Sequence, residues 1–150
     1  MHYVAYGPKE LIDGIDKGLV ARAVCEAEKN GGKIEITDDE NALAGADVIY
    51  TDIWASMGEE AQIPERVRML TPYKVTQDMM DKTKNSDVIF MHCLPSFHDF
   101  ETRMAKEQME KGYDIREVTD EVFRSKNSVV FDEAENRMHT IKAVVVATLA

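Results

Sequence analysis

One short stretch of the sequence gathers residues that could do chemistry. After an apolar run that begins at Val88, it contains the following side chains: His92, Cys93, Leu94, Pro95, His98 and Asp99. A short, bounded apolar run predicts a buried strand, and open α/β sheets bind ligands just beyond the carboxyl ends of their strands. The stretch holds one of two cysteines and two of four histidines. It therefore indicates a site, without saying which chemistry the site performs.

Residue types alone leave more than one interpretation of this stretch. Cysteine is often a small core residue, and a lone histidine at a strand end is often a satisfied polar group. Pro95 favours a site, because proline ends ladder pairing and fixes a tight loop after the strand. A cis Leu94–Pro95 bond fits such a loop. Zinc bound by the two histidines, Cys93 and Asp99 is disfavoured, because no second pair of ligands follows.

Two other apolar segments are also followed by polar clusters. The loop after one of them contains Asp52, Ser56 and Met57. A carboxylate there could hold an ammonium group, and a hydroxyl could bind a small polar ligand. Arg137 lies in a polar run beyond the last expected strand and could bind an anion or polarise a carbonyl. The plainer alternatives are an Asp-initiated turn and a solvated helix face, but three clusters at one sheet edge favour a site.

Composition excludes several classes of function. The chain has 150 residues and a formal net charge of -10, which would repel nucleic acid and anionic membrane surfaces. No GxGxxG, GxxxxGK[ST] or GxSxG motif supports a nucleotide or serine-hydrolase site. No apolar run is long enough to span a bilayer, and no leader is recognised. Cys25 and Cys93 are too few for a disulfide framework, which favours free thiols in a reducing cytoplasm.

Strands and helices alternate along the chain. This pattern predicts one three-layer α/β/α domain over residues 1–150, with a parallel sheet of about four to five strands. The expected strands are His2–Tyr6, Lys33–Thr37, Asp47–Thr51, Asp87–His92 and Ser128–Phe131. The expected helices are Lys17–Lys29, a short one before Gly45, Pro64–Leu70, Thr76–Lys82, an amphipathic one within Asp99–Gly112, Thr119–Arg124 and Asp132–Ala150.

Four motifs carry a resemblance to a known family. They are TDIWASMGEE (Thr51–Glu60), MHCLPSFHD (Met91–Asp99), EVTDEVF (Glu117–Phe123) and FDEAENRMHTIKAVVVATL (Phe131–Leu149). The chain resembles the C-terminal, ornithine-binding domain of the ornithine carbamoyltransferases, within the aspartate/ornithine carbamoyltransferase superfamily. HCLP and DEAENR mark the superfamily, and Ser-Met-Gly is the narrower mark of the ornithine enzymes. The resemblance covers essentially the whole chain and implies a Rossmann-like fold.

The resemblance also implies a reaction and the roles of site residues. Family members transfer a carbamoyl group from carbamoyl phosphate to the δ-amine of L-ornithine, giving L-citrulline and phosphate. By resemblance, the amino-acid end of ornithine would be held by three residues: Asp52, Ser56 and Met57. No metal or organic cofactor is implied.

The carbamoyl side of the site is assigned by the same resemblance. Cys93 would lie near the attacking δ-amine, and Cys93 and Leu94 would contact the carbamoyl group through backbone atoms, with His92 beside them. Arg137 would stabilise negative charge that grows on the carbonyl oxygen. The expected catalytic residues are therefore Cys93, Arg137 and Asp52.

Departures from the family pattern indicate half of a composite site. The phosphate-binding Ser-Thr-Arg-Thr motif of the family lies in an N-terminal domain and has no match here. The first strand of the C-terminal domain, which lies beside the strand corresponding to His2–Tyr6, and an asparagine-bearing loop after it are also unmatched. We expect an incomplete domain that is inactive alone, with the resulting gap closed by strand rearrangement or by another chain. Full-length family enzymes are homo-oligomers, trimers or multiples of them.

Two alternative functions remain open. Within the superfamily, the chain could belong to a putrescine or other amino-acid carbamoyltransferase, although Ser56 and Met57 favour ornithine. Outside it, the chain could be a non-catalytic module that binds a small molecule.

Overall fold

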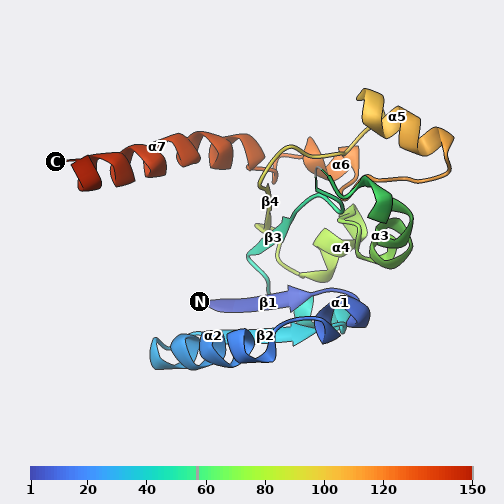
Figure 1. The fold of residues 1–150 in the computed structure, drawn as a ribbon. Helices are drawn as coiled ribbons and strands as arrows, with labels where there is room; N and C mark the ends of the chain where they lie inside the picture. Colours follow the sequence, from blue (N-terminus) through green and yellow to red (C-terminus); the bar gives the residue numbers. More distant parts are fainter. Residues whose placement is uncertain (57, 150) are drawn as a thin grey trace. The chain divides into compact units, whose positions relative to one another are not determined.

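The structure, a computed structural model, describes residues 1–56 and 58–149. The chain divides into two compact units, Met1–Ala44 and Gly45–Ala150. Helices and parallel strands alternate in both units (Figure 1). The α/β class predicted from the sequence is confirmed.

The first unit is a β-α-α-β motif. Its elements are β1 (His2–Tyr6), α1 (Lys9–Asp13), α2 (Lys17–Lys29), β2 (Lys33–Thr37) and the 3₁₀ helix η1 (Glu40–Leu43). Strands β1 and β2 pair in parallel, with His2 opposite Lys33. Helix α2 begins where the Asp16 carboxylate accepts the Leu19 N–H at 2.8 Å, which satisfies one free donor of the first turn. Within this unit only Pro8 and Leu43 are buried, so it has little apolar core of its own.

The second unit contains the rest of the sheet strands and most of the core. Its elements are β3 (Val48–Thr51), η2 (Glu60–Gln62), α3 (Ile63–Leu70), η3 (Thr71–Tyr73), α4 (Gln77–Lys82), β4 (Ile89–His92), α5 (Arg103–Glu110), α6 (Asp120–Phe123) and α7 (Val130–Leu149). Strands β3 and β4 pair in parallel, from Val48 opposite Ile89 to Thr51 opposite His92.

One face of the β3–β4 pair is buried and the other is partly exposed. Ile49 and Phe90 lie opposite each other and are both buried, whereas Tyr50 is 54% exposed. Because side chains alternate across a strand, this pattern places the core of the unit on the Ile49 side. The segments around Val75 and Val118, both buried, are joined by a parallel bridge.

Most predicted elements are confirmed within one or two residues. The strands His2–Tyr6 and Lys33–Thr37 and the helix Lys17–Lys29 have the predicted bounds. Thr76 is the N-cap of α4, because its hydroxyl accepts the Met79 N–H. The amphipathic helix α5 is shorter than the segment predicted to contain it, and its Met109 side chain is 49% exposed.

The predicted strand Ser128–Phe131 is wrong. Only an isolated bridge joins Ser128 to Phe90, and the helix begins at Val130 rather than Asp132. The β-branched valines suggested a strand. The acidic residues Asp132 and Glu133 occupy the first turn of α7, however, where negative charge stabilises a helix N-terminus.

The sheet differs from the single one predicted. The described strands form two separate two-stranded parallel sheets, β1–β2 and β3–β4. The prediction that residues 1–150 are one domain, incomplete at its N-terminus, stays a prediction.

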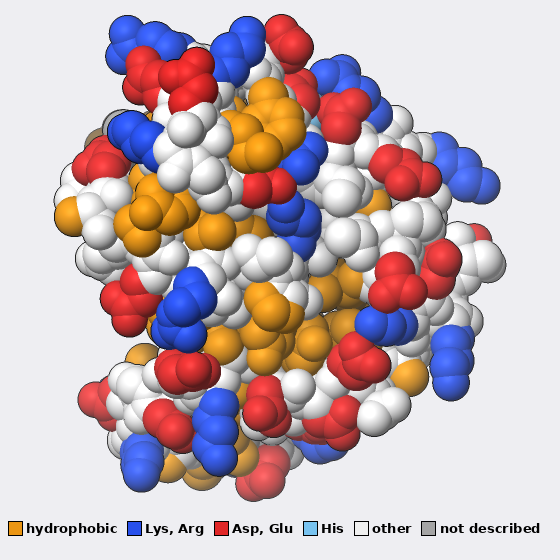
Figure 2. Space-filling model, turned by 90° about the vertical axis from the view of Figure 1, so that its right-hand side faces the viewer, with side chains coloured by type: hydrophobic (Ala, Val, Ile, Leu, Met, Phe, Trp, Pro, Cys, Tyr) orange, Lys and Arg blue, Asp and Glu red, His pale blue; other side chains and the backbone are white. Residues whose placement is uncertain are grey.

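Helix α7 runs away from the end of β4 after its first turn (Figure 1). Val130 is buried, but the later apolar side chains are largely exposed, among them Ile141, Val144, Val145, Val146 and Leu149. No helix within residues 1–56 and 58–149 combines the length and apolar character needed to cross a membrane. Figure 2 shows a surface on which acidic and basic side chains are interspersed, with hydrophobic side chains between them.

The packing of β4 gives a direct test of this core. Phe90 is fully buried, so Phe90→Ala should lower the free energy of unfolding by about 3–5 kcal/mol in urea titrations followed by circular dichroism. Val146 is 65% exposed, and Val146→Ala should change it by less than about 0.5 kcal/mol. Equal effects of the two substitutions would contradict the described packing.

Candidate functional site

Parallel pairing of β3 and β4 brings Asp52 and Cys93 together. The last residues in register are Thr51 and His92, so Asp52 and Cys93 are the next residues along each strand. The Cys93 thiol donates a hydrogen bond to Asp52 Oδ1 at 3.0 Å, and the same oxygen accepts the Ile53 N–H at 2.7 Å. Two residues predicted independently from the sequence are therefore in direct contact.

The surroundings of this pair keep the Cys93 thiol protonated. Partial desolvation of the thiol and its hydrogen bond to the Asp52 carboxylate raise the pKa of Cys93 to about 11, and the charge of Glu133 adds to the effect. Nearby, partial desolvation and the Glu133 carboxylate raise the pKa of Tyr50 to about 12. A neutral thiol can donate a hydrogen bond but is a poor nucleophile, so the pair is suited to binding and orientation.

The loop after β4 has an unusual backbone at Leu94. This residue has φ of +48°, a left-handed conformation that is uncommon for a bulky side chain, and the Leu94–Pro95 bond is cis, as the sequence predicted. The Leu94 N–H donates a hydrogen bond to His92 Nδ1 at 2.9 Å. In the neutral ring, the proton of His92 therefore lies on Nε2.

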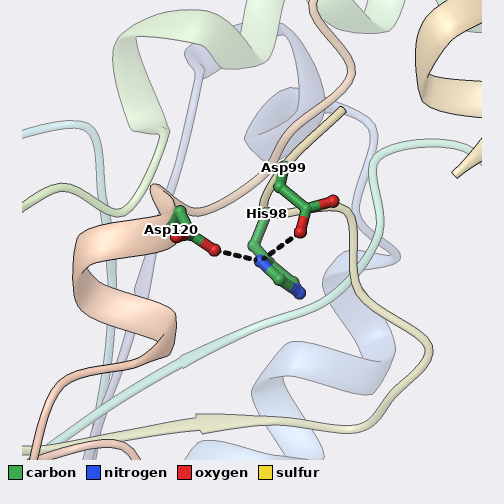
Figure 3. Close-up of side chains that lie close together, drawn as sticks. All are labelled: His98, Asp99 and Asp120. Carbon is green, nitrogen blue, oxygen red and sulfur yellow. Dashed lines mark hydrogen bonds and ion pairs between the residues drawn. The ribbon is translucent and has the colours of Figure 1, made fainter. Parts of the chain in front are cut away.

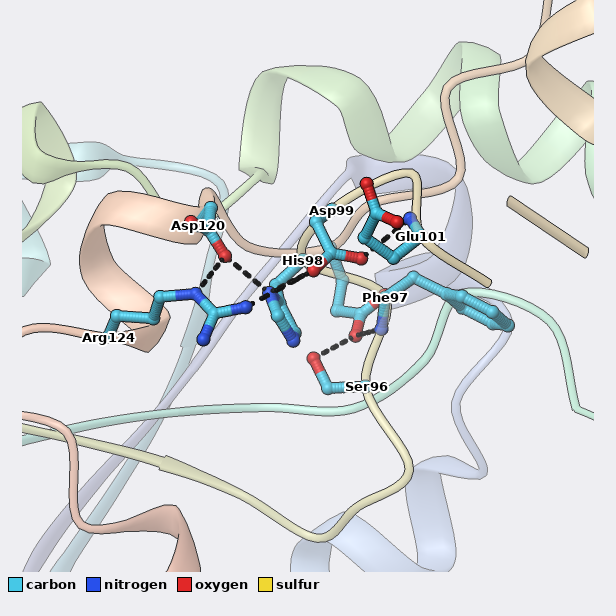
Figure 4. Close-up of polar contacts among 8 residues, drawn as sticks. Ser96, Phe97, His98, Asp99, Glu101, Asp120 and Arg124 are labelled. Atoms are coloured by element: carbon cyan, nitrogen blue, oxygen red, sulfur yellow. Dashed lines mark hydrogen bonds and ion pairs between the residues drawn. The ribbon is translucent and has the colours of Figure 1, made fainter. Parts of the chain in front are cut away.

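A buried carboxylate, Glu117, holds this loop from behind. Glu117 and His92 are both fully buried, with Oε1 of Glu117 3.0 Å from Nε2 of His92. The same Oε1 accepts the Ser96 hydroxyl and the Phe97 N–H, each at 2.6 Å. Figure 4 labels Ser96 and Phe97, whose hydroxyl and backbone N–H make these two bonds. Two donors from the loop, with the His92 ring beside them, thus offset part of the cost of burying a carboxylate.

Glu133 connects the first turn of α7 to the end of β4. Its Oε2 accepts the His92 N–H at 3.1 Å, and its carboxylate contributes to the raised pKa of Tyr50. This contact places the polar run of α7 at the same sheet edge as Cys93, as the sequence predicted for that run.

The loop after β3 carries the other predicted ligand-binding residues. Ser56 and Asp52 are exposed, and the Ser56 N–H donates to Glu59 Oε2 at 3.1 Å. Met57 lies outside the described residues. Gly58 has φ of +91°, which a glycine adopts without strain.

Arg137 is exposed on α7, one helical turn after Glu133. In the described part of the chain, no hydrogen bond or ion pair joins its guanidinium to Asp52 or Cys93. The structure therefore brings Asp52, His92, Cys93 and Leu94 together. Arg137 lies on α7 and is exposed to solvent.

The residues considered for zinc do not form one cluster. His92 faces Glu117, whereas His98 Nδ1 lies 2.7 Å from Asp120 and 3.6 Å from Asp99 (Figure 3). Arg124 bonds both of these carboxylates and would repel a cation (Figure 4). The His98 ring also stacks on Phe123 at 3.8 Å. These contacts give His98, Asp99 and Asp120 a structural role, because they join the loop after β4 to α6.

Comparison with known proteins decides the family. A family model described as "Aspartate/ornithine carbamoyltransferase, Asp/Orn binding domain" matches residues 1–148. The chain belongs to this family. The catabolic ornithine carbamoyltransferase of Clostridium perfringens is 59% identical over 151 residues, which cover 99% of this chain. The chain spans 45% of that relative's length.

Solved structures of carbamoyltransferases agree with this assignment. Ornithine carbamoyltransferase from Pyrococcus furiosus matches with a TM-score of 0.71 at 39% identity, covering 95% of this chain and 40% of that one. The anabolic ornithine carbamoyltransferase from Campylobacter jejuni matches with a TM-score of 0.75 at 30% identity, covering 97% and 42% respectively. These matches also support the α/β fold.

Sequence reasoning missed three residues of the candidate site. Glu117 stood in a quoted motif, EVTDEVF, but nothing local showed that it was buried against the loop after β4. Glu133 stood in the polar run of α7, and Tyr50 was read only as part of a strand. The available signal for Glu117 and Glu133 was the presence of a glutamate inside a motif that could lie next to a strand end.

The raised pKa of Cys93 predicts slow alkylation. In a Cys25→Ala background, labelling of Cys93 by iodoacetamide at pH 8 should be about 100-fold slower than for a thiol of ordinary pKa, because only the thiolate reacts. The rate should rise with pH until it levels near the pKa of about 11. Asp52→Asn should shift the profile to lower pH, whereas Asp13→Asn, a remote control, should not. A profile that Asp52→Asn leaves unchanged would contradict the contact.

Proposed function

We propose that residues 1–150 form the ornithine-binding domain of an ornithine carbamoyltransferase, and supply one half of its active site. The reaction is transfer of the carbamoyl group of carbamoyl phosphate to the δ-amine of L-ornithine, giving L-citrulline and phosphate. The observation that carries the proposal is the hydrogen bond between Cys93 and Asp52 at 3.0 Å, in a chain whose family match covers residues 1–148.

Three residues of the loop after β3 would hold the amino-acid end of ornithine. Asp52 and Ser56 are exposed, so a ligand can reach both. The Asp52 carboxylate would pair with an ammonium group, Ser56 would bond a polar group, and Met57 would contribute beside them. Ionic pairing of this kind orients a small zwitterion while leaving its δ-amine free to react.

The residues after β4 and on α7 would act on the reacting groups. The δ-amine loses a proton and attacks the carbonyl carbon, forming a C–N bond as the C–O bond to phosphate breaks. The protonated Cys93 thiol and the backbone of His92 and Leu94 would orient these groups. Arg137 would stabilise the negative charge that develops on the carbonyl oxygen. Its guanidinium is available for this role, because it is bonded to neither Asp52 nor Cys93.

The other half of the site would come from a carbamoyl phosphate domain. The C. perfringens relative is more than twice as long as its matched segment, and the phosphate-binding motif expected for the family has no match in this sequence. The exposed apolar side chains of α7 are one surface that such a domain would cover. We further propose a homo-oligomer, a trimer or a multiple of trimers, in the cytoplasm, where both free cysteines would remain reduced.

A putrescine or other amino-acid carbamoyltransferase is the nearest alternative. The Ser56-Met57-Gly58 motif favours ornithine. A non-catalytic binding module is the second alternative, and it predicts ligand binding without chemistry.

A chimera tests the proposal. The matched segment of the C. perfringens enzyme would be replaced by residues 1–150, and citrulline formation from ornithine and carbamoyl phosphate measured. The chimera should be active and should prefer ornithine to putrescine, whereas the 150-residue chain alone should form no citrulline. A folded but inactive chimera, or activity of the chain alone, would contradict the proposal.

Substitutions within the chimera test the role of Arg137. Arg137→Ala should reduce kcat by about 10²–10³-fold, because a positive charge aimed at the developing oxyanion is lost. Arg103→Ala is the matched control, since the Arg103 side chain is 91% exposed on α5, and it should leave kcat unchanged. Equal effects of the two substitutions on kcat would show that Arg137 is not a catalytic residue.

A further inference from the structure

The loop that carries Asp52 and Ser56 has one buried side chain. Trp54 is 8% exposed, although its neighbours in the loop are exposed or half-buried. Trp54 and Ala55 line a small apolar crevice together with the following residues: Ile63, Phe97, Met104 and Ile115. The position of the loop therefore depends on how firmly the Trp54 indole is held beside this crevice.

Lys74 lies over the Trp54 ring. Its Nζ is 5.7 Å from the ring centroid, within the range of a cation–π contact. Only 13% of the Lys74 side chain is exposed, and a cation so buried needs a partner. Asp114 is that partner, with Oδ2 at 2.8 Å from Nζ. The charge that faces the indole is thus fixed in place by a carboxylate from a distant part of the chain.

Asp114 is in turn held by Arg116. The guanidinium donates two hydrogen bonds to the carboxylate, Nε to Oδ1 at 2.9 Å and Nη2 to Oδ2 at 2.8 Å. Although burial alone would raise the pKa of Asp114, the hydrogen bonds from Arg116 and Lys74 lower it below its usual value. Arg116 also stacks over the Phe100 ring at 4.1 Å. We call Trp54, Lys74, Asp114 and Arg116 the Trp54 cluster.

The Trp54 cluster is joined to the support of the loop after β4. Val75, next to Lys74, donates its N–H to the Glu117 carbonyl at 2.9 Å and accepts the Thr119 N–H at 3.0 Å. The Glu117 side chain holds Ser96 and Phe97. Two paired segments therefore hold both loops at the sheet edge, one through Lys74 and the other through Glu117.

We propose that Lys74 and Asp114 are positioning residues for amino-acid binding, because they fix Trp54 and thereby the loop that presents Asp52 and Ser56. They touch no ligand themselves. The inference rests on the proposed function for the identity of the ligand, whereas the arrangement of Trp54, Lys74 and Asp114 stands without it.

Trp54 is the only tryptophan, so its fluorescence in the 150-residue chain reports on the loop. Lys74→Met should shift the emission to longer wavelength and about double the acrylamide quenching constant, because the cation–π contact is lost. Lys74→Arg keeps the charge and should restore values close to those of the original chain. Lys126→Met, which removes an exposed lysine elsewhere, is the matched control. Circular dichroism establishes that each variant is folded.

Calorimetric titration with L-ornithine measures the consequence for binding. The Kd should increase about tenfold in Lys74→Met and return toward the original value in Lys74→Arg. If Lys74→Met does not fold, Asp114→Asn provides the same two readouts. Unchanged quenching and unchanged Kd in a folded variant would overturn the inference. Failure of the original chain to bind ornithine would contradict the proposed function and the assignment to amino-acid binding, while quenching would still decide whether Lys74 fixes Trp54.

Discussion

The site depends on the register between β3 and β4. Because Thr51 lies opposite His92, the next residues, Asp52 and Cys93, meet just beyond the ends of the two strands. A shift of one residue would turn the side chains of β3 to the opposite face and separate this pair. Burial of Ile49 against Phe90 prevents such a shift, since it would expose apolar surface on one strand. The hydrophobic core thus determines the geometry of a polar site.

Side chains from later in the sequence hold the loops that follow these strands. Glu117 accepts donors from the loop after β4, and Lys74 covers Trp54 in the loop after β3. Both supports are largely buried, whereas Asp52, Ser56 and Cys93 are exposed. A rigid base beneath accessible polar groups is an arrangement that would keep the candidate site preorganised without closing it to a ligand.

The sequence was informative where structure is local and uninformative where it depends on distant contacts. Alternating apolar residues, turns and caps predicted β1, β2 and α2 with the observed bounds, and motifs identified Asp52 and Cys93. Ser128–Phe131 was misread because strand propensity was outweighed by the start of α7. The roles of Glu117 and Lys74 could not be predicted, because the partners of each lie about 20 to 40 residues away. The pairing of the described strands into two separate sheets likewise depends on contacts between segments far apart in the sequence.

We propose that the exposed residues after β3 and β4 form one amino-acid site. The most direct test is an assigned amide NMR spectrum of the 150-residue chain during titration with L-ornithine. We predict saturable shifts confined to the loop from Asp52 to Ser56, the residues His92 to Leu94 and the first turns of α7. No saturable shift at these amides, or shifts centred elsewhere, such as on α4, would contradict the account.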